Sequence, residues 1–281
     1  MCNIICWAKA QPTILYRRLG LGPTNKINLL QYLGRILIIF WLPFNLYAKT
    51  LTIAVTSSFA STFMQLAPIF EKKTNIKSKA SYASSGQLAT HIMHGAPIDV
   101  FLSADQNHII KLENAGLALP ADRVTYAYGE LVMAVTGINH KALDIKILLT
   151  TQINKIAVAN PIFAPYGVAT LQVFERTGLL TALKPKVVWG ESVGQVASFI
   201  QSGNVTAGFI ARSQCYLLQK QKNYLSFWLV PHKLYDPIKH CATRILTSKK
   251  HKAAKLFLSF LKTKSARMIM RTNGYIQDTA K

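Results

Sequence analysis

Acidic residues are scarce in this sequence, since 11 Asp and Glu stand against 33 Lys and Arg and give a formal net charge of +22. An excess of this size is compatible with a nucleic acid, a membrane surface or a small anionic ligand as partner. The basic residues are scattered along the chain, and neither helix-turn-helix spacing nor a zinc-knuckle pattern accompanies them. We therefore expect a diffusely basic protein that does not bind nucleic acid.

Charged residues and cysteines are also few. Only 16% of the residues are charged and half are hydrophobic, which argues against extended disorder and fits a packed globular protein. Of the four cysteines, only Cys215 and Cys241 follow the N-terminal segment. An oxidising compartment would permit a disulfide between them, and two free buried thiols are an equally open alternative.

Long hydrophobic runs are missing from the N-terminal segment. Its apolar run at 36–42 is far shorter than the roughly 20 residues of a membrane-spanning helix. Residues 1–48 contain no Asp or Glu, place five Lys and Arg before that run, and end on the small residue Ala48. This order predicts a signal peptide cleaved after Ala48, with an uncleaved membrane anchor as the alternative. The long stretch before the apolar run favours a translation start downstream, which would leave residues 1–25 untranslated.

From Lys49 onward, strand and helix patterns alternate. Hydrophobic periodicity predicts strands at 51–55, 98–102, 131–135 and 155–159, and helices at about 59–70, 166–177, 193–202 and 252–271. Strands that alternate with helices predict an α/β fold with mostly parallel sheets. Because such sheets bind ligands beyond the C-terminal ends of their strands, the turns from strand to helix should carry the chemistry.

Four such turns offer hydroxyls or small residues at the start of a helix. They are Val55-Thr-Ser-Ser-Phe59, Tyr82-Ala-Ser-Ser-Gly-Gln87, Asn160-Pro-Ile-Phe-Ala-Pro-Tyr-Gly167 and Gly190-Glu-Ser-Val-Gly-Gln195. The first N–H groups of a helix have no partner within it, and the helix dipole places partial positive charge there. Converging helix starts could therefore hold an anion without Lys or Arg. For any single turn, ordinary capping is the more common explanation.

The same segments carry a family resemblance. The blocks TLTIAVTSSFASTFMQLAPIF (50–70), SYASSGQLATHIMHGAPIDVFLSAD (81–105), NPIFAPYGVAT (160–170) and ESVGQVASFIQSGNVTAGFIARSQ (191–214) resemble periplasmic molybdate-binding proteins of ABC importers in order and spacing. The resemblance implies a two-lobed periplasmic-binding-protein fold of type II, each lobe a mixed, mostly parallel sheet flanked by helices. Lobe 1 would comprise 49–131 and 237–281 and lobe 2 would comprise 132–236, with hinge strands crossing near 131–134 and 234–237.

By position, the resemblance implies five ligand-binding residues. They are Ser57, Ser58, Ser85, Tyr166 and, through its backbone N–H, Val193. The chain departs from the family at the first turn, where Ser-Ser replaces a familiar Thr-Asn pair. It also has Ala211 where one branch of the family has a ligand-binding Tyr, and it resembles the branch with Tyr at position 166. No side chain would coordinate a metal directly, because the metal arrives as an oxyanion.

Molybdate, tungstate and sulfate are deprotonated dianions near neutral pH, so their oxygens only accept hydrogen bonds. A site built of donors suits them, whereas hydrogen phosphate would also require an acceptor. We expect a periplasmic monomer, not an enzyme and without a cofactor, that captures molybdate and tungstate and delivers them to a permease and its ATPase. The alternatives are a receptor for sulfate or another oxyanion, an enzyme on this fold, and a ligand-sensing regulator.

Several other signals are interpreted as structural. His91 and His94 have a spacing that can bind metal, but no carboxylates or cysteines accompany them, so we expect solvent-facing helix residues. Asp99 and Asp105 are interpreted as turn capping or packing. The basic C-terminal run is expected to dock on lobe 1 through Leu256, Phe257, Phe260 and Leu261.

Overall fold

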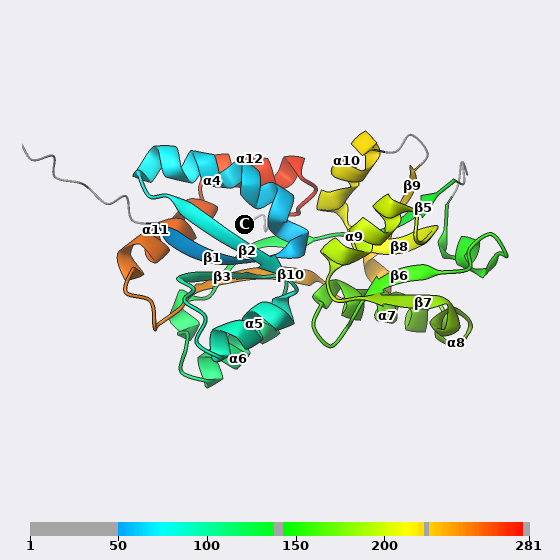
Figure 1. Cartoon of the computed structure of the whole chain (residues 1–281), viewed down its shortest axis with the longest axis horizontal. Coiled ribbons are helices and arrows are strands. Elements are labelled where there is room, and N and C mark those ends of the chain that lie inside the picture. The colour runs from blue at the N-terminus through cyan, green and yellow to red at the C-terminus, as the bar shows by residue number, and fades with distance from the viewer. Residues whose placement is uncertain (1–49, 138–142, 222–224, 278–281) are drawn as a thin grey trace, which may run out of the picture. The chain divides into compact units, whose positions relative to one another are not determined.

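The structure is a computed structural model, and it describes residues 50–137, 143–221 and 225–277 (Figure 1). The predicted leader, residues 1–48, lies outside these ranges. Within the described ranges, every helix is too short or too polar to cross a lipid bilayer.

The first of two five-stranded sheets has the strand order β2-β1-β3-β10-β4. Its strands are β1 (Leu51–Thr56), β2 (Ser78–Ala83), β3 (Val100–Ser103), β4 (Val124–Gly129) and β10 (Ile238–Arg244). Strand β1 pairs in parallel with β2 and β3, whereas β10 is antiparallel to both β3 and β4.

The second sheet has the order β7-β6-β8-β5-β9. Its strands are β5 (Leu131–Thr136), β6 (Ile156–Ala159), β7 (Val187–Gly190), β8 (Ala207–Ala211) and β9 (Leu225–Leu229). Strand β6 is parallel to β7 and β8, and β5 is antiparallel to β8 and β9. Each sheet is therefore evenly mixed, less parallel than the sequence predicts. Among the described residues, every antiparallel pairing of two strands involves β5 or β10, the strands through which the chain enters one sheet from the other, so these pairings lie outside the βαβ repeats.

Helices cover both faces of the first sheet (Figure 1). One face packs against α4 (Ala60–Thr74), α11 (His251–Leu261) and α12 (Lys264–Thr272), and the other against α5 (Ser85–Met93) and α6 (Asn107–Asn114). Alternation along β1 explains the two cores, because Ile53 and Val55 point into the first and Ala54 points into the second. The short 3₁₀ segments η1 (Ser57–Phe59) and η2 (Pro120–Asp122) also belong to this half of the molecule.

The second sheet packs against α7 (Pro165–Arg176), α9 (Val193–Ser202) and α10 (Arg212–Gln221) around a single core cluster. The remaining elements are α8 (Leu180–Leu183) and the 3₁₀ segments η3 (Ile145–Leu149), η4 (Lys184–Lys186) and η5 (His232–Leu234). Helices α5, α7 and α9 each begin within a few residues of the end of a strand, as the sequence predicts.

Two expectations about the C-terminal run are wrong. The predicted helix at 252–271 is divided into α11 and α12, because Thr263 begins a new helix and its Oγ1 accepts a hydrogen bond from the Ala266 N–H at 3.3 Å. Leu256 is 51% exposed and does not dock, whereas Phe257, Phe260 and Leu261 are buried as predicted.

The chain first crosses from one sheet to the other at Glu130. Strand β4 ends at Gly129, and Leu131 already pairs with Ala211 in the second sheet.

Candidate functional site

The first predicted turn follows β1 and forms η1. Ser57 is partly exposed, and its Oγ accepts a hydrogen bond from the Gly194 N–H at 3.2 Å. Ser58 is fully buried, and its Oγ has no hydrogen-bond partner among the described residues. Its carbonyl oxygen is held from two sides, by the hydroxyls of Ser213 at 2.7 Å and Tyr275 at 2.8 Å. The backbone of this turn is thus fixed while a buried hydroxyl is left free.

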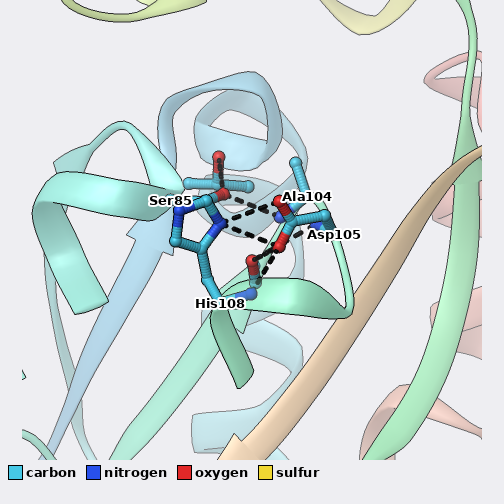
Figure 2. Close-up of polar contacts among 6 residues, drawn as sticks. Ser85, Ala104, Asp105 and His108 are labelled. Atoms are coloured by element: carbon cyan, nitrogen blue, oxygen red, sulfur yellow. Dashed lines mark hydrogen bonds and ion pairs between the residues drawn. The ribbon is translucent and has the colours of Figure 1, made fainter. Parts of the chain in front are cut away.

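The second turn begins α5 through a capping box. Ser84 accepts from the N–H three residues on, and the Gln87 side chain accepts from the Ser84 N–H at 3.2 Å. Ser85 is fully buried, and its Oγ accepts from the Ala104 N–H at 2.9 Å (Figure 2). Its own proton points to Thr56 Oγ1 over 3.3 Å, which is long for hydroxyl groups. An acceptor with a charge would compete well for that proton.

The third turn places Tyr166 in the first turn of α7, directly after Pro165. Tyr166 is 2% exposed, and its hydroxyl lies 3.3 Å from His240 Nε2. Burial raises the pKa of the Tyr166 phenol well above its usual value, and nearby tyrosines add to the shift. The phenol therefore stays protonated and can donate a hydrogen bond.

The fourth turn places Val193 as the first residue of α9, with Ser192 as its cap. Ser192 Oγ accepts from the Gln195 N–H at 3.2 Å, and the Gly194 N–H donates to Ser57. No described hydrogen bond uses the N–H of Val193, nor that of Ser85 at the corresponding position of α5. Two helix starts therefore each present an unpaired N–H in a buried residue, in the positive field of the helix dipole.

Contacts between the two sheets' elements bring these turns together. The Gly86 N–H at the start of α5 donates to the Phe163 carbonyl before α7 at 2.8 Å, and the Gln87 amide reaches Glu191 at 3.2 Å. The Ser57–Gly194 hydrogen bond joins the first turn to the fourth. All five residues predicted from sequence thus lie on turns that are connected by direct contacts.

Two glycines permit this close approach. A Cβ at Gly129 would lie 2.1 Å from the Tyr166 hydroxyl, and one at Gly86 would lie 2.8 Å from the Phe163 Cα. Neither distance can accommodate a side chain, so both positions require glycine.

The electrostatics of the site depend on neutral groups. In the described structure no Lys or Arg side chain hydrogen-bonds any of the five residues, and Glu191 at the fourth turn is exposed. A carboxylate does lie beyond Ser85, where Asp105 pairs with His108 Nδ1 at 2.8 Å (Figure 2). Burial alone would raise the pKa of Asp105, but hydrogen bonds and charge from His108, together with Ser103, lower it.

The signals interpreted as structural have structural partners. His91 and His94 are exposed, and Asp99 accepts from the Thr52 N–H at 2.6 Å and from Lys250 Nζ at 3.0 Å. Within the described residues no group of His, Cys, Asp and Glu could hold a metal ion. Cys215 and Cys241 are free thiols, and burial raises the pKa of Cys215 to about 12.

Sequence reasoning missed Gly129, Tyr126 and His240. The hydroxyl of Tyr126 lies 3.2 Å from His240 Nδ1, so His240 connects two tyrosines. No local pattern marks His240, because its partners are 114 and 74 residues away in the chain. A single buried histidine in a strand becomes informative only when its neighbours are known.

Comparison with known proteins agrees with this architecture. The family described as bacterial extracellular solute-binding protein matches residues 51–276. The molybdate-binding protein ModA of Rhodobacter capsulatus is 37% identical over 80% of this chain and 87% of its own length. ModA of Azotobacter vinelandii is 35% identical over 81% of this chain and 90% of its own length.

Among solved structures, the periplasmic molybdate-binding protein of Azotobacter vinelandii superimposes with a TM-score of 0.75 at 36% identity, covering 80% of this chain and 98% of that one. These relatives support an extracytoplasmic location. The two mixed sheets flanked by helices are the predicted two-lobed α/β architecture. The chain belongs to the family of bacterial extracellular solute-binding proteins, which serve transport and are not enzymes.

Proposed function

We propose that this protein captures molybdate or tungstate between its two sheets and delivers it to an ABC importer. The observation that carries the proposal is that hydrogen bonds join helix starts from both sheets, and that one of the joined turns contains the buried, unpartnered hydroxyl of Ser58. The names of the relatives point to the same ligand, since both ModA proteins are called molybdate-binding.

The proposed donors are the hydroxyls of Ser57, Ser58, Ser85 and Tyr166 and the N–H groups at the starts of α5 and α9, the latter that of Val193. All are neutral, which suits a ligand that must enter and leave, because no buried cation is left unpaired without it. Hydrogen bonds to a charged group contribute roughly 1.5–3 kcal/mol each. About six of them would contribute roughly 9–18 kcal/mol, enough for the roughly 8–12 kcal/mol of a micromolar to nanomolar complex before the cost of closure is subtracted.

The two halves of the site belong to two proposed lobes, 49–131 with 237–281 and 132–236. Because donors come from both, binding completes only when the lobes close. The hydrogen bonds from Gly86 to Phe163 and from Gly194 to Ser57 would form on closure and favour the closed form.

The route to the ligand is also part of the proposal. Export through the leader, with cleavage after Ala48, would place a monomer in the periplasm. The loaded protein would then dock on a membrane permease driven by its ATPase. No cofactor is required, because the oxyanion is the cargo.

Isothermal titration of the purified protein with molybdate, tungstate, sulfate and phosphate tests the proposal. We expect molybdate and tungstate to bind with micromolar or tighter constants. Sulfate should bind at least about 100-fold more weakly, because donors spaced for the larger ion would lie too far from some of its oxygens. Equal affinity for sulfate would instead support a general oxyanion receptor. Failure of all four ions to bind would exclude the oxyanion site.

A further inference from the structure

Three buried side chains, those of Tyr126, His240 and Tyr166, form a hydrogen-bonded chain that ends at the Tyr166 hydroxyl. Tyr126 Oη is 3.2 Å from His240 Nδ1, and Tyr166 Oη is 3.3 Å from His240 Nε2. Tyr126 is 5% exposed, Tyr166 is 2% exposed and His240 is fully buried. Within the described structure, the Tyr126 hydroxyl and the two ring nitrogens of His240 have no other hydrogen-bond partners.

The imidazole in this chain is neutral. Burial lowers the pKa of His240 to about 3, and the charge of Asp105 opposes that shift. The rings of Tyr126, Tyr166 and Tyr275 surround it, with centroids 5.7, 6.1 and 5.1 Å away. A neutral imidazole has one N–H donor and one acceptor nitrogen, so its two tyrosines must play opposite roles.

The two possible arrangements are not equivalent. If Nδ1 carried the hydrogen, it would donate to Tyr126 Oη, and the buried Tyr126 proton would have no acceptor. If Nε2 carries it, Tyr126 donates to Nδ1, His240 donates to Tyr166 Oη, and only the Tyr166 proton is left, on the side where the ligand is proposed to bind. An unpaired buried polar group is expensive, so the second arrangement is favoured when a bound oxyanion accepts the Tyr166 proton.

We propose that Tyr126 fixes His240 as the Nε2–H tautomer, so that His240 donates to Tyr166 Oη and the Tyr166 proton is directed to the ligand. His240 and Tyr126 are then positioning residues, and this inference rests on the proposed oxyanion function. A hydroxyl that already accepts a hydrogen bond is also a better donor, because chained hydrogen bonds polarise one another.

The consequence is selectivity for fully deprotonated oxyanions. With its acceptor side facing Nε2–H, Tyr166 offers the ligand only a proton. A protonated oxygen, such as that of hydrogen phosphate, would meet a donor and lose its own hydrogen bond. Gly129 protects this arrangement, since a Cβ there would lie 2.1 Å from Tyr166 Oη and 2.9 Å from His240 Nε2.

The tautomer can be measured directly in the protein saturated with molybdate. Nitrogen-15 NMR of histidine-labelled protein distinguishes Nδ1–H, Nε2–H and doubly protonated rings. We expect the Nε2–H form of His240 throughout the range from about pH 5 to pH 8, where an exposed histidine titrates. An Nδ1–H or charged ring would overturn the proposal.

A double-mutant cycle tests the connection to binding. Tyr126→Phe removes the hydroxyl but keeps the ring, and we expect molybdate affinity to fall about 3- to 10-fold, the worth of one neutral hydrogen bond. In a Tyr166→Phe background the same change should have no further effect, because the chain then has no proton to direct. Additive losses would mean that Tyr126 acts only through stability, and would contradict the proposal.

Tyr235→Phe is the matched control. Its buried hydroxyl accepts from the Leu131 N–H at 3.2 Å and does not touch His240 nitrogens, so its effect should be the same in both backgrounds. If the unmodified protein binds none of the oxyanions, the proposed function fails together with this role. If it binds molybdate but the tautomer or the cycle disagrees, only the role of Tyr126 and His240 fails.

Discussion

Two buried regions of this molecule treat negative charge in different ways. At the crossing between the sheets, the Glu130 carboxylate is 5% exposed and pairs with the Arg212 guanidinium and with His232 Nε2, the latter at 3.2 Å. Around Ser58, the groups placed to meet negative charge are neutral hydroxyls and backbone N–H groups. One region contains a permanent charge with permanent partners, and the other contains donors whose acceptor is proposed to come and go.

The difference follows from desolvation. A buried charge without a partner is strongly destabilising, so a fixed carboxylate requires fixed cations. A site with buried lysines or arginines would face the same penalty whenever its ligand left. Neutral donors avoid this, because an unpaired N–H or hydroxyl costs less than an unpaired ion. The excess of positive charge in the chain is therefore separate from the proposed recognition chemistry.

The strongest test of this contrast inserts one methyl group at the neutral site. Gly129→Ala places a Cβ only 2.1 Å from Tyr166 Oη, so the tyrosine must move. We expect molybdate affinity to fall by at least about 100-fold and stability by about 1–3 kcal/mol, measured by titration and by urea unfolding. Gly194→Ala provides a graded comparison, because its Cβ would meet Ser57 Cβ at 3.1 Å, needs a much smaller adjustment and should weaken binding less.

A second test removes a single neutral donor. Ser85→Ala deletes the hydroxyl that is held by the Ala104 N–H, and we expect an approximately 10- to 100-fold loss of molybdate affinity by calorimetry. Ser198→Ala changes an exposed serine on α9 and should bind as the unmodified protein does. An unchanged affinity for Ser85→Ala would remove this residue from the site and leave the fold intact.

The pH dependence of stability tests whether the buried His240 is neutral, and it does so independently of the ion pairs of Glu130. His240 has a folded pKa of about 3 against an ordinary value of 6.5, so the unfolded chain binds more protons between these values. The stability contributed by His240 is therefore complete above about pH 6.5 and is lost progressively as the pH falls toward 3. Between pH 7 and pH 5 we expect a loss of about 2 kcal/mol that is absent in His240→Phe, measured by urea unfolding at both pH values. Equal losses in the two proteins would contradict a neutral buried His240.

The smallest effect on binding and stability is expected from changes at Glu130, where the chain crosses between the sheets. Glu130→Gln keeps the shape but removes the carboxylate, and Arg212 is half exposed and can regain water. We expect stability to fall by about 1 kcal/mol while molybdate affinity stays within about threefold. Asp236→Asn, at the exposed Arg176–Asp236 pair, should change neither property. A large loss of binding in Glu130→Gln would mean that the crossing and the site are coupled.

Much of the fold was predictable because it is local. The alternation at 51–55 and the helical spacing of Phe59, Phe63, Leu66 and Phe70 each depend on residues a few positions apart. The antiparallel pairings of β5 and β10 were not predictable in this way, because they join segments from distant parts of the chain. The break at Thr263 was missed because the hydrophobic spacing continues through it.

The candidate site likewise has features set by nearby residues and features set by distant ones. By itself, the sequence determined the four turns and their proposed donors, since the first N–H groups of a helix have no partner within it whatever surrounds the helix. Only the tertiary structure decided that Tyr126 and His240 lie behind Tyr166 and that Gly129 must have no side chain. The reason is physical: capping depends on neighbours within one turn of helix, whereas the direction of a buried proton depends on every polar group that folding brings within hydrogen-bond distance.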